Sequence, residues 1–218
     1  MQDQAPAATV SRLITYLRVI RQFEAVGLER TSSEALAEAS NVSAFQIRKD
    51  LAYFGTFGTR GSGYLVSTIG LRLREILGLT DVYDIAIVGM GRLGQAITDY
   101  PAMGEYGFRI RGMFDSDPGK VGLEFAGIEV SPMDSLPTLM RQRNFDMGMI
   151  AVPSAAAQEV ADTLVSAGVR ALLNFAPVVL NVPEGVMVEP VDFVASLKRL
   201  SYHLRGKPVL RHAARQAT

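Results

Sequence analysis

The sequence contains no cysteine, no tryptophan and only two histidines among its 218 residues. Without cysteine there is no disulfide framework and no thiolate metal site, so any redox function must depend on a bound cofactor. Lys+Arg and Asp+Glu balance at 22 each, so net charge favours no class of partner. No run of about 18 apolar residues occurs, and residues 1–12 lack the charged-then-apolar pattern of a signal peptide. We therefore expect a cytoplasmic protein with no membrane partner and no metal.

Three helices are predicted before residue 55, and a fourth, "VSTIGLRLREILGL", follows the glycine-rich stretch and ends near Gly78. Residues 11–27 carry apolar side chains at helical spacing. Thr31 with Glu34, and Ser43 with Gln46, are capping boxes, which predict helices that start at about 32 and 44. The short turn between these two suits a helix-turn-helix. Because such pairs are also common in helical cores, the pattern alone leaves both interpretations open.

The second helix of this pair has one apolar and one polar face. At about 100° per residue, Ile47 and Leu51 fall on a stripe that can be buried. The opposite side carries residue types able to meet base edges and phosphates in a major groove, namely Phe45, Gln46, Lys49 and Tyr53, with Arg48 on the flank. An exposed Phe45 is hard to justify otherwise, unless another helix covers it. This face favours a DNA-recognition helix.

The stretch "GTFGTRGSGY" at 55–64 follows this helix and carries four glycines. Aromatic and β-branched residues on both sides of "RGSG" predict a two-stranded hairpin, and hence a winged-helix domain over 1–80. Arg60 at the tip is expected in a minor groove, with Gly61 allowing close backbone approach. Because no Gly-Lys-Ser/Thr follows, the stretch is not a P-loop.

From residue 84 onward, buried strands alternate with helices, which predicts a parallel sheet and a Rossmann domain over 84–191. Gly89, Gly91 and Gly94 stand in G-x-G-x-x-G spacing directly after a strand and at the start of a helix. Asp115 ends the next strand, where a carboxylate accepts from ribose hydroxyls and repels a 2′-phosphate, so NAD(H) is favoured over NADP(H). A glycine turn without a ligand is the less favoured alternative.

A dinucleotide site raises the alternative of an NAD-dependent dehydrogenase whose N-terminal helices serve dimerisation. Its chemistry is hard to find, because His203 and His212 both lie in the C-terminal helix or tail and no tyrosine has a lysine four residues later. We therefore expect no catalytic residue and no enzyme, with the nucleotide acting as a signal. A catalytic lysine or carboxylate stays open.

The chain closes with a helix predicted over 192–206 and a tail over 207–218. Asp192 is a candidate N-cap, and an apolar stripe follows at Phe193, Leu197, Leu200 and Leu204. This stripe fits either a cover for the chain's own core or a contact with a second chain.

Seven motifs carry a resemblance to a known family. With "SRLITYLR", "FQIRKDLAYFG", "GTRGSGY", "VGMGRLGQA", "FDSDPGKVG", "NFAP" and "VDF" in this order, the sequence resembles the Rex family of bacterial redox-sensing repressors over nearly its whole length. The resemblance implies a homodimer that binds palindromic double-stranded operator DNA when NAD+ predominates and releases it when NADH binds. It also implies that the C-terminal helix is exchanged between subunits.

The resemblance also implies three sets of site residues. The DNA-binding set is Ser43, Phe45, Gln46, Arg48, Lys49, Tyr53, Arg60 and Gly61. The cofactor-binding set is Gly89, Met90, Gly91, Arg92, Leu93, Gly94, Asp115, Lys120, Val152, Pro153, Asn174, Phe175, Ala176, Pro177 and Phe193, the last seven on the nicotinamide side. The switch set is Arg18, Tyr100 and Asp192, in which Asp192 changes partner as the cofactor changes.

Overall fold

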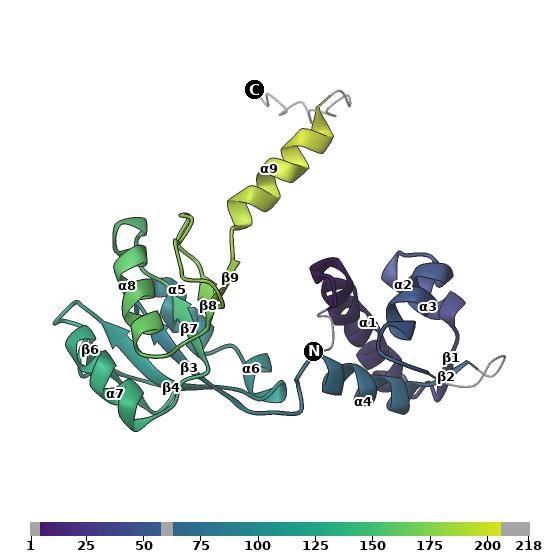
Figure 1. The fold of residues 1–218 in the computed structure, drawn as a ribbon, viewed down its shortest axis with the longest axis horizontal. Coiled ribbons are helices and arrows are strands. Elements are labelled where there is room, and N and C mark those ends of the chain that lie inside the picture. The colour runs from purple at the N-terminus through teal and green to yellow at the C-terminus, as the bar shows by residue number, and fades with distance from the viewer. Residues whose placement is uncertain (1–4, 58–62, 206–218) are drawn as a thin grey trace, which may run out of the picture. The chain divides into compact units, whose positions relative to one another are not determined.

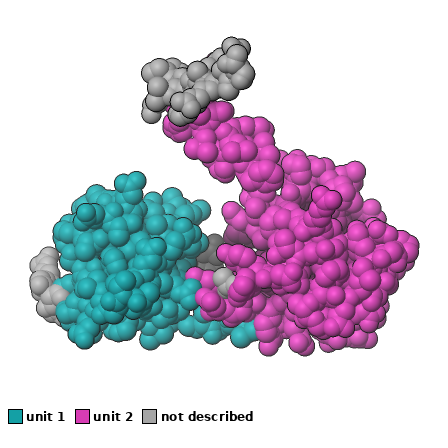
Figure 2. Space-filling view, turned by 180° about the vertical axis from the view of Figure 1, so that it is seen from behind, with its two compact units in different colours: residues 1–82 teal, residues 83–218 magenta. Residues whose placement is uncertain are grey.

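The structure is a computed structural model that describes residues 5–57 and 63–205, apart from the side chains of residues 102 and 141 (Figure 1). The chain divides into two compact units, Met1–Val82 and Tyr83–Thr218 (Figure 2). The predicted minor-groove residues Arg60 and Gly61 lie outside the described residues. Among the described helices, none combines the length and the apolar character needed to cross a bilayer.

In residues 5–57 and 63–82, the first unit contains four helices and one short antiparallel ladder. Its elements are α1 (Ala7–Ala25), β1 (Arg30–Thr31), α2 (Ser33–Ser40), α3 (Ala44–Ala52), β2 (Tyr64–Leu65) and α4 (Val66–Ile76). The helices share one core, in which Leu13, Ile20, Leu36, Ile47 and Leu73 are fully buried. The predicted helix-turn-helix is present as α2 and α3.

The helix caps differ in part from the prediction. The Ser43 hydroxyl accepts from the Gln46 N–H at 3.1 Å and starts α3, as predicted. The predicted cap of α2 is wrong by one residue, because the Ser32 hydroxyl accepts from the Ala35 N–H at 3.1 Å. Thr31 is drawn instead into β1, where it pairs with Tyr64.

The predicted hairpin around "RGSG" falls in part on residues 58–62, which lie outside the described residues. In the described residues β2 pairs with β1, so Arg30 lies opposite Leu65, and Thr56 and Phe57 are not in a strand. Phe57 packs against the helical core instead. The two partner strands lie before α2 and after α3, and only the packing of these helices brings them together.

The described part of the second unit, residues 83–205, is a seven-stranded sheet with helices on both faces. Its strands are β3 (Tyr83–Val88), β4 (Phe108–Asp115), β5 (Glu124–Phe125), β6 (Ile128–Pro132), β7 (Met147–Ile150), β8 (Ala171–Asn174) and β9 (Met187–Pro190). The order is β5-β6-β4-β3-β7-β8-β9, and only the edge strand β5 is antiparallel. The six parallel strands thus run 3-2-1-4-5-6, which is the order of the predicted Rossmann fold.

Two groups of apolar side chains hold the helices to the two faces of this sheet. One face carries α7 (Leu136–Gln142) and α8 (Ser154–Ser166), which pack around Phe114 and Ile150. The other carries α5 (Arg92–Thr98) and α6 (Ala102–Glu105), with Ile97 packed against Ile87 and its neighbours. A one-turn 3₁₀ helix, Met133–Ser135, leads into α7. The helix α9 (Phe193–Leu204) follows β9, and none of its residues is buried.

Candidate functional site

The outer face of α3 is exposed, as the sequence predicts. Phe45 is 69% exposed and Tyr53 is 47% exposed, and Arg48 and Lys49 also face solvent. Arg48 Nη1 lies 3.1 Å from Glu34 Oε1 on α2, in an ion pair between two exposed side chains that contributes little to stability. No helix of the described chain buries Phe45, so the alternative that another helix covers it does not hold for the described residues.

The sequence analysis missed a buried carboxylate on the same helix. Asp50 is only 3% exposed, and Arg12 on α1 binds it with both Nε (2.6 Å to Oδ2) and Nη2 (2.7 Å to Oδ1). The Tyr16 hydroxyl donates to Oδ2 at 2.7 Å, and Gln46 Nε2 donates to Oδ1 at 2.8 Å. Asp50 therefore ties α3 to α1. The signal in the sequence was its place four residues after Gln46, next to the buried stripe of Ile47 and Leu51.

These contacts keep the carboxylate ionised. Burial by itself raises the pKa of Asp50, but the hydrogen bonds from Arg12, Tyr16 and Gln46 outweigh it and lower the pKa to about 2. In turn, burial and the bond to Asp50 raise the pKa of the Tyr16 hydroxyl.

Acid is expected to remove the stabilisation that Asp50 contributes. Since its pKa lies at about 2 in the folded protein, below the ordinary value of 3.8, folding favours the ionised form. The stabilisation is complete above about pH 5 and is lost as the pH falls through about 2, which costs about 2 kcal/mol of unfolding free energy. Urea titrations at a series of pH values should show that wild type and Asp50→Asn differ less in unfolding free energy as the pH falls through this window. A difference that stays constant down to the lowest pH would contradict this assignment.

The glycine loop between β3 and α5 has the backbone that the motif requires. Gly89 has φ +98°, a conformation that favours glycine, and its N–H donates to the Phe114 carbonyl at 2.8 Å. A Cβ on Gly94 would collide with the Gly89 carbonyl oxygen, so α5 can approach the loop only with glycine there. A Cβ on Gly91 would meet no atom within 4 Å. The space in front of Gly91 is therefore open to a ligand.

Asp115 at the end of β4 braces this loop. It is 6% exposed, and its Oδ2 accepts from the Met90 N–H at 2.8 Å and from Lys120 Nζ at 3.0 Å. Its Oδ1 accepts from the Asp117 N–H at 2.8 Å. Burial acts to raise the pKa of Asp115, but these donors lower it below the ordinary value, and the bond to Asp115 raises the pKa of Lys120. The carboxylate is thus ionised and holds the glycine loop to the segment that follows β4, at the carboxyl edge of the sheet.

A large pocket of about 1040 Å³ lies at this edge. Of the predicted cofactor residues, those that line it are Gly89, Gly91, Arg92, Leu93, Asp115, Lys120, Val152 and Pro153. Met90 and Gly94 are buried directly behind the loop. The pocket is open, mixed in polarity and backed by glycine, which fits the phosphates and ribose of a dinucleotide.

Apart from Val152 and Pro153, the residues predicted on the nicotinamide side do not line this pocket. Asn174 is 1% exposed, and its amide is used within the chain, donating to the Val178 carbonyl and accepting from the Ala176 N–H, both at 2.9 Å. It therefore holds the turn that contains Ala176 and the exposed Pro177. Phe193, on α9, is 74% exposed. Their placement beside a nicotinamide stays a prediction.

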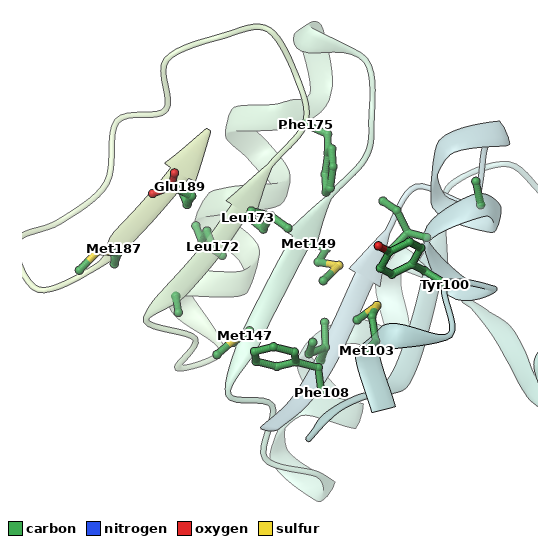
Figure 3. Close-up of a pocket in the computed structure, with 14 residues that line it drawn as sticks. Tyr100, Met103, Phe108, Met147, Met149, Leu172, Leu173, Phe175, Met187 and Glu189 are labelled. Atoms are coloured by element: carbon green, nitrogen blue, oxygen red, sulfur yellow. The ribbon is translucent and has the colours of Figure 1, made fainter. Parts of the chain in front are cut away.

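A second pocket, of about 510 Å³, is almost wholly apolar and opens on the face of the sheet that carries α5 and α6 (Figure 3). Methionine and aromatic side chains gather there from both sides, with Met103 and Phe108 opposite Met147 and Met149. Phe175, predicted in the cofactor site, and the switch residue Tyr100 also line it. A parallel sheet is normally covered on both faces, so this opening marks a surface that lacks its cover.

The switch residues are distributed over both units. Arg18 lies on α1 in the first unit, whereas Tyr100 and Asp192 belong to the second, and all three side chains are exposed. Asp192 caps α9, since its Oδ1 accepts from the Ala195 N–H at 2.9 Å, as predicted. The apolar stripe of α9 is uncovered, with Leu197, Leu200 and Leu204 each 58–60% exposed. Within the described chain, the stripe does not cover the protein's own core.

Comparisons with known proteins find matches to each of the two units and to the chain as a whole. A family model described as "Putative DNA-binding protein N-terminus" matches residues 4–52, and one described as "CoA binding domain" matches residues 80–178. The redox-sensing transcriptional repressor Rex of Thermus thermophilus is 53% identical over 199 residues, covering 91% of this chain and 93% of that protein.

Two solved structures match over most of their length. The crystal structure of RSP in complex with β-NAD+ and operator DNA has a TM-score of 0.89 at 38% identity, covering 92% of this chain and 93% of that one. RSP in complex with β-NADH has a TM-score of 0.85 at 36% identity, covering 92% and 94%. RSP is itself described as a Rex-family repressor.

Proposed function

The chain belongs to the Rex family of redox-sensing transcriptional repressors, and from this we propose that it is a repressor that binds operator DNA and is released by NADH. The observation that carries the proposal is the pairing of an uncovered recognition helix in one unit with a glycine-loop pocket in the other. The relatives are named as transcriptional regulators, so the dehydrogenase alternative is set aside.

On the DNA side, we assign the exposed face of α3 to the major groove. Lys49 and Arg48 supply positive charge for phosphates and guanine, and Phe45 supplies an apolar surface for thymine methyl groups. Ser43 and Tyr53, at the two ends of the helix, complete this set. Arg60 and Gly61 remain our prediction for the minor groove.

On the cofactor side, we assign the dinucleotide to the pocket in front of Gly91. Asp115 lies where the adenosine ribose is bound in this fold, and Lys120, Val152 and Pro153 line the same pocket. NADH supplies binding energy here and no reaction. An apolar surround for the nicotinamide, to which Phe193 contributes, disfavours the positive charge of the oxidised ring and so favours NADH over NAD+.

We propose that the working form is a homodimer held by α9. Its stripe of Phe193, Leu197, Leu200 and Leu204 needs an apolar partner, and the pocket beside Tyr100 is a surface of that kind (Figure 3). If two copies exchange α9, the stripe of one copy covers the pocket of the other, and neither apolar surface stays exposed to water. Two recognition helices related by a two-fold axis then require a palindromic operator.

NADH acts in this scheme by shifting an equilibrium between two arrangements of the dimer. In one arrangement, the distance between the two α3 helices fits two successive major grooves. In the other arrangement, which NADH favours, that distance does not fit. Complete switching from 1:99 to 99:1 requires an affinity difference of about 10⁴-fold between the two states. Arg18, Tyr100 and Asp192 are our candidates for the side chains that differ between them.

The proposal is tested by titrating both cofactors against DNA binding. The protein is bound to a palindromic duplex selected from a random library, and NADH and NAD+ are added separately in a gel-shift assay. NADH should release the duplex at lower concentration than NAD+. If neither cofactor changes binding, the sensor function is wrong.

Asp115→Ala should keep DNA binding but need more NADH for release; an unchanged NADH response would remove Asp115 from the site.

Lys49→Ala should weaken operator binding by about tenfold and leave NADH affinity unchanged, because we assign Lys49 to the DNA surface and it does not line the cofactor pocket. Both affinities can be measured by fluorescence, with labelled duplex for one and the cofactor's own emission for the other. Arg72→Ala on α4 removes the same charge from an exposed side chain and is the matched control. Loss of both affinities in Lys49→Ala would point to misfolding, and an effect equal to that of Arg72→Ala would remove Lys49 from the interface.

A further inference from the structure

The network around Asp50 contains one member that faces the proposed DNA surface. Gln46 is the third residue of α3, one turn before Asp50, and it is half-buried between Asp50 and the exposed face of the helix. The first residues of a recognition helix are those that reach base edges. The other residues that donate to Asp50, namely Thr9, Arg12 and Tyr16, lie on α1.

The contact with Asp50 sets the orientation of the Gln46 amide. An ionised carboxylate only accepts hydrogen bonds, so the atom of Gln46 that faces it at 2.8 Å must be Nε2 and not Oε1. The amide oxygen is therefore turned away from Asp50. Nε2 keeps a second N–H for another acceptor, because only one of its two hydrogens is used by the carboxylate.

The position of Asp50 is itself held firmly. Arg12 binds both carboxylate oxygens, and Tyr16 adds a third short bond, so the carboxylate cannot rotate without losing several contacts. Gln46 is thus oriented by a group that is anchored to a different helix. A side chain ordered before binding loses less entropy when it meets its ligand.

We propose that Asp50 is a positioning residue that fixes the Gln46 amide to read an adenine in the operator. The outward oxygen and the second N–H of Gln46 match the N6 amino group and N7 of adenine in the major groove. This inference rests on the proposed DNA-binding function and adds to it the means by which one base pair of each half-site is selected.

The test compares Asp50→Asn with Gln46→Met, alone and combined. An asparagine can face Gln46 with either its oxygen or its nitrogen, so it no longer imposes one orientation on the amide. Each variant is assayed against the selected duplex and against duplexes with one base pair changed at each half-site position. Discrimination is the ratio of the affinities for the selected duplex and for the changed one. We expect Gln46→Met to abolish discrimination at one A·T pair, and Asp50→Asn to lower it there by about fivefold to tenfold. In the double variant, Asp50→Asn should add no further loss of discrimination.

Tyr16→Phe is the control for a merely structural effect. It removes one bond from Asp50 and leaves the contact with Gln46, so it should lower stability in urea but keep the discrimination. The inference about Asp50 would be overturned by any one of three results: full discrimination in Asp50→Asn, a further loss of discrimination in the double variant, or an equal loss in Tyr16→Phe. None of these results would bear on the proposed DNA-binding function. If the wild-type protein selected no duplex at all, the proposed function would fail as well.

Discussion

Gly94→Ala is expected to abolish NADH binding and to lower the free energy of unfolding of the second unit by about 3 kcal/mol. The added Cβ would overlap the carbonyl oxygen of Gly89, which is backbone and cannot rotate away as a flexible side chain does. Relief of this clash requires α5 to move off the loop, and that movement also breaks the bond from Met90 to Asp115. Thermal or urea unfolding, with NADH fluorescence titration, measures both effects.

Gly91→Ala separates binding from folding at the same loop. Its backbone, with φ −78° and ψ −169°, suits alanine, and a Cβ there meets no atom of the protein within 4 Å. Stability should therefore stay within about 1 kcal/mol of wild type. The methyl group would stand in the space assigned to the pyrophosphate, so NADH should fail to release the operator.

Gly104→Ala is the control for both variants, because it also adds a methyl group where a Cβ meets nothing within 4 Å, but on α6, away from the loop. It should change neither NADH binding nor stability. Unimpaired NADH binding in Gly91→Ala would move the cofactor to another site. Normal stability and NADH affinity in Gly94→Ala would show that the close packing of α5 on the loop has no role.

Leu197→Lys combined with Leu200→Lys is expected to convert the homodimer to a monomer and to weaken operator binding by 100-fold or more. Both leucines are more than half exposed in the single chain, so they contribute little to its own core. Lysine at these positions cannot enter an apolar pocket without a large desolvation cost. A monomer binds one half-site at a time. It therefore loses the increase in affinity that comes from binding both half-sites together, which is about 10²–10⁴-fold for linked sites.

Sedimentation and gel-shift measurements test this pair. Ala195→Lys with Tyr202→Lys places the same charges on the opposite side of α9 and is the matched control, expected to stay dimeric. Melting of the single chain should be nearly unchanged by the leucine variants. A leucine variant that remained a dimer with wild-type affinity for the operator would rule out α9 as the dimer contact.

Local patterns were enough for those parts of the sites that depend on neighbouring residues. The glycine loop was predictable because its three glycines lie within six residues and each has a local reason: Gly89 has a positive φ, Gly91 leaves space for a ligand, and Gly94 lets α5 pack closely on the loop. The exposed face of α3 followed from helical periodicity, and Phe45 stands out in the structure as it did in the sequence. The Asp192 cap is a contact with the third residue after it.

Contacts between distant segments were not predictable in this way. The β1–β2 ladder joins Thr31 to Tyr64, and nothing near residue 64 in the sequence points to a partner so far away. Asp50 looks like a surface carboxylate until α1 places Arg12 and Tyr16 against it. Asn174, matched to the cofactor by its motif, is used by the turn that follows it.

The sequence by itself determined the two units, their fold classes, the dinucleotide loop and the polar face of the recognition helix. Those features depend on periodicity, capping and glycine spacing, which act over a few residues. The tertiary structure alone decided that Asp50 orients Gln46, that Asp115 braces the glycine loop, and that the stripe of α9 and the pocket beside Tyr100 both lie uncovered. These depend on which segments pack together, because hydrogen bonding and burial are properties of neighbours in space.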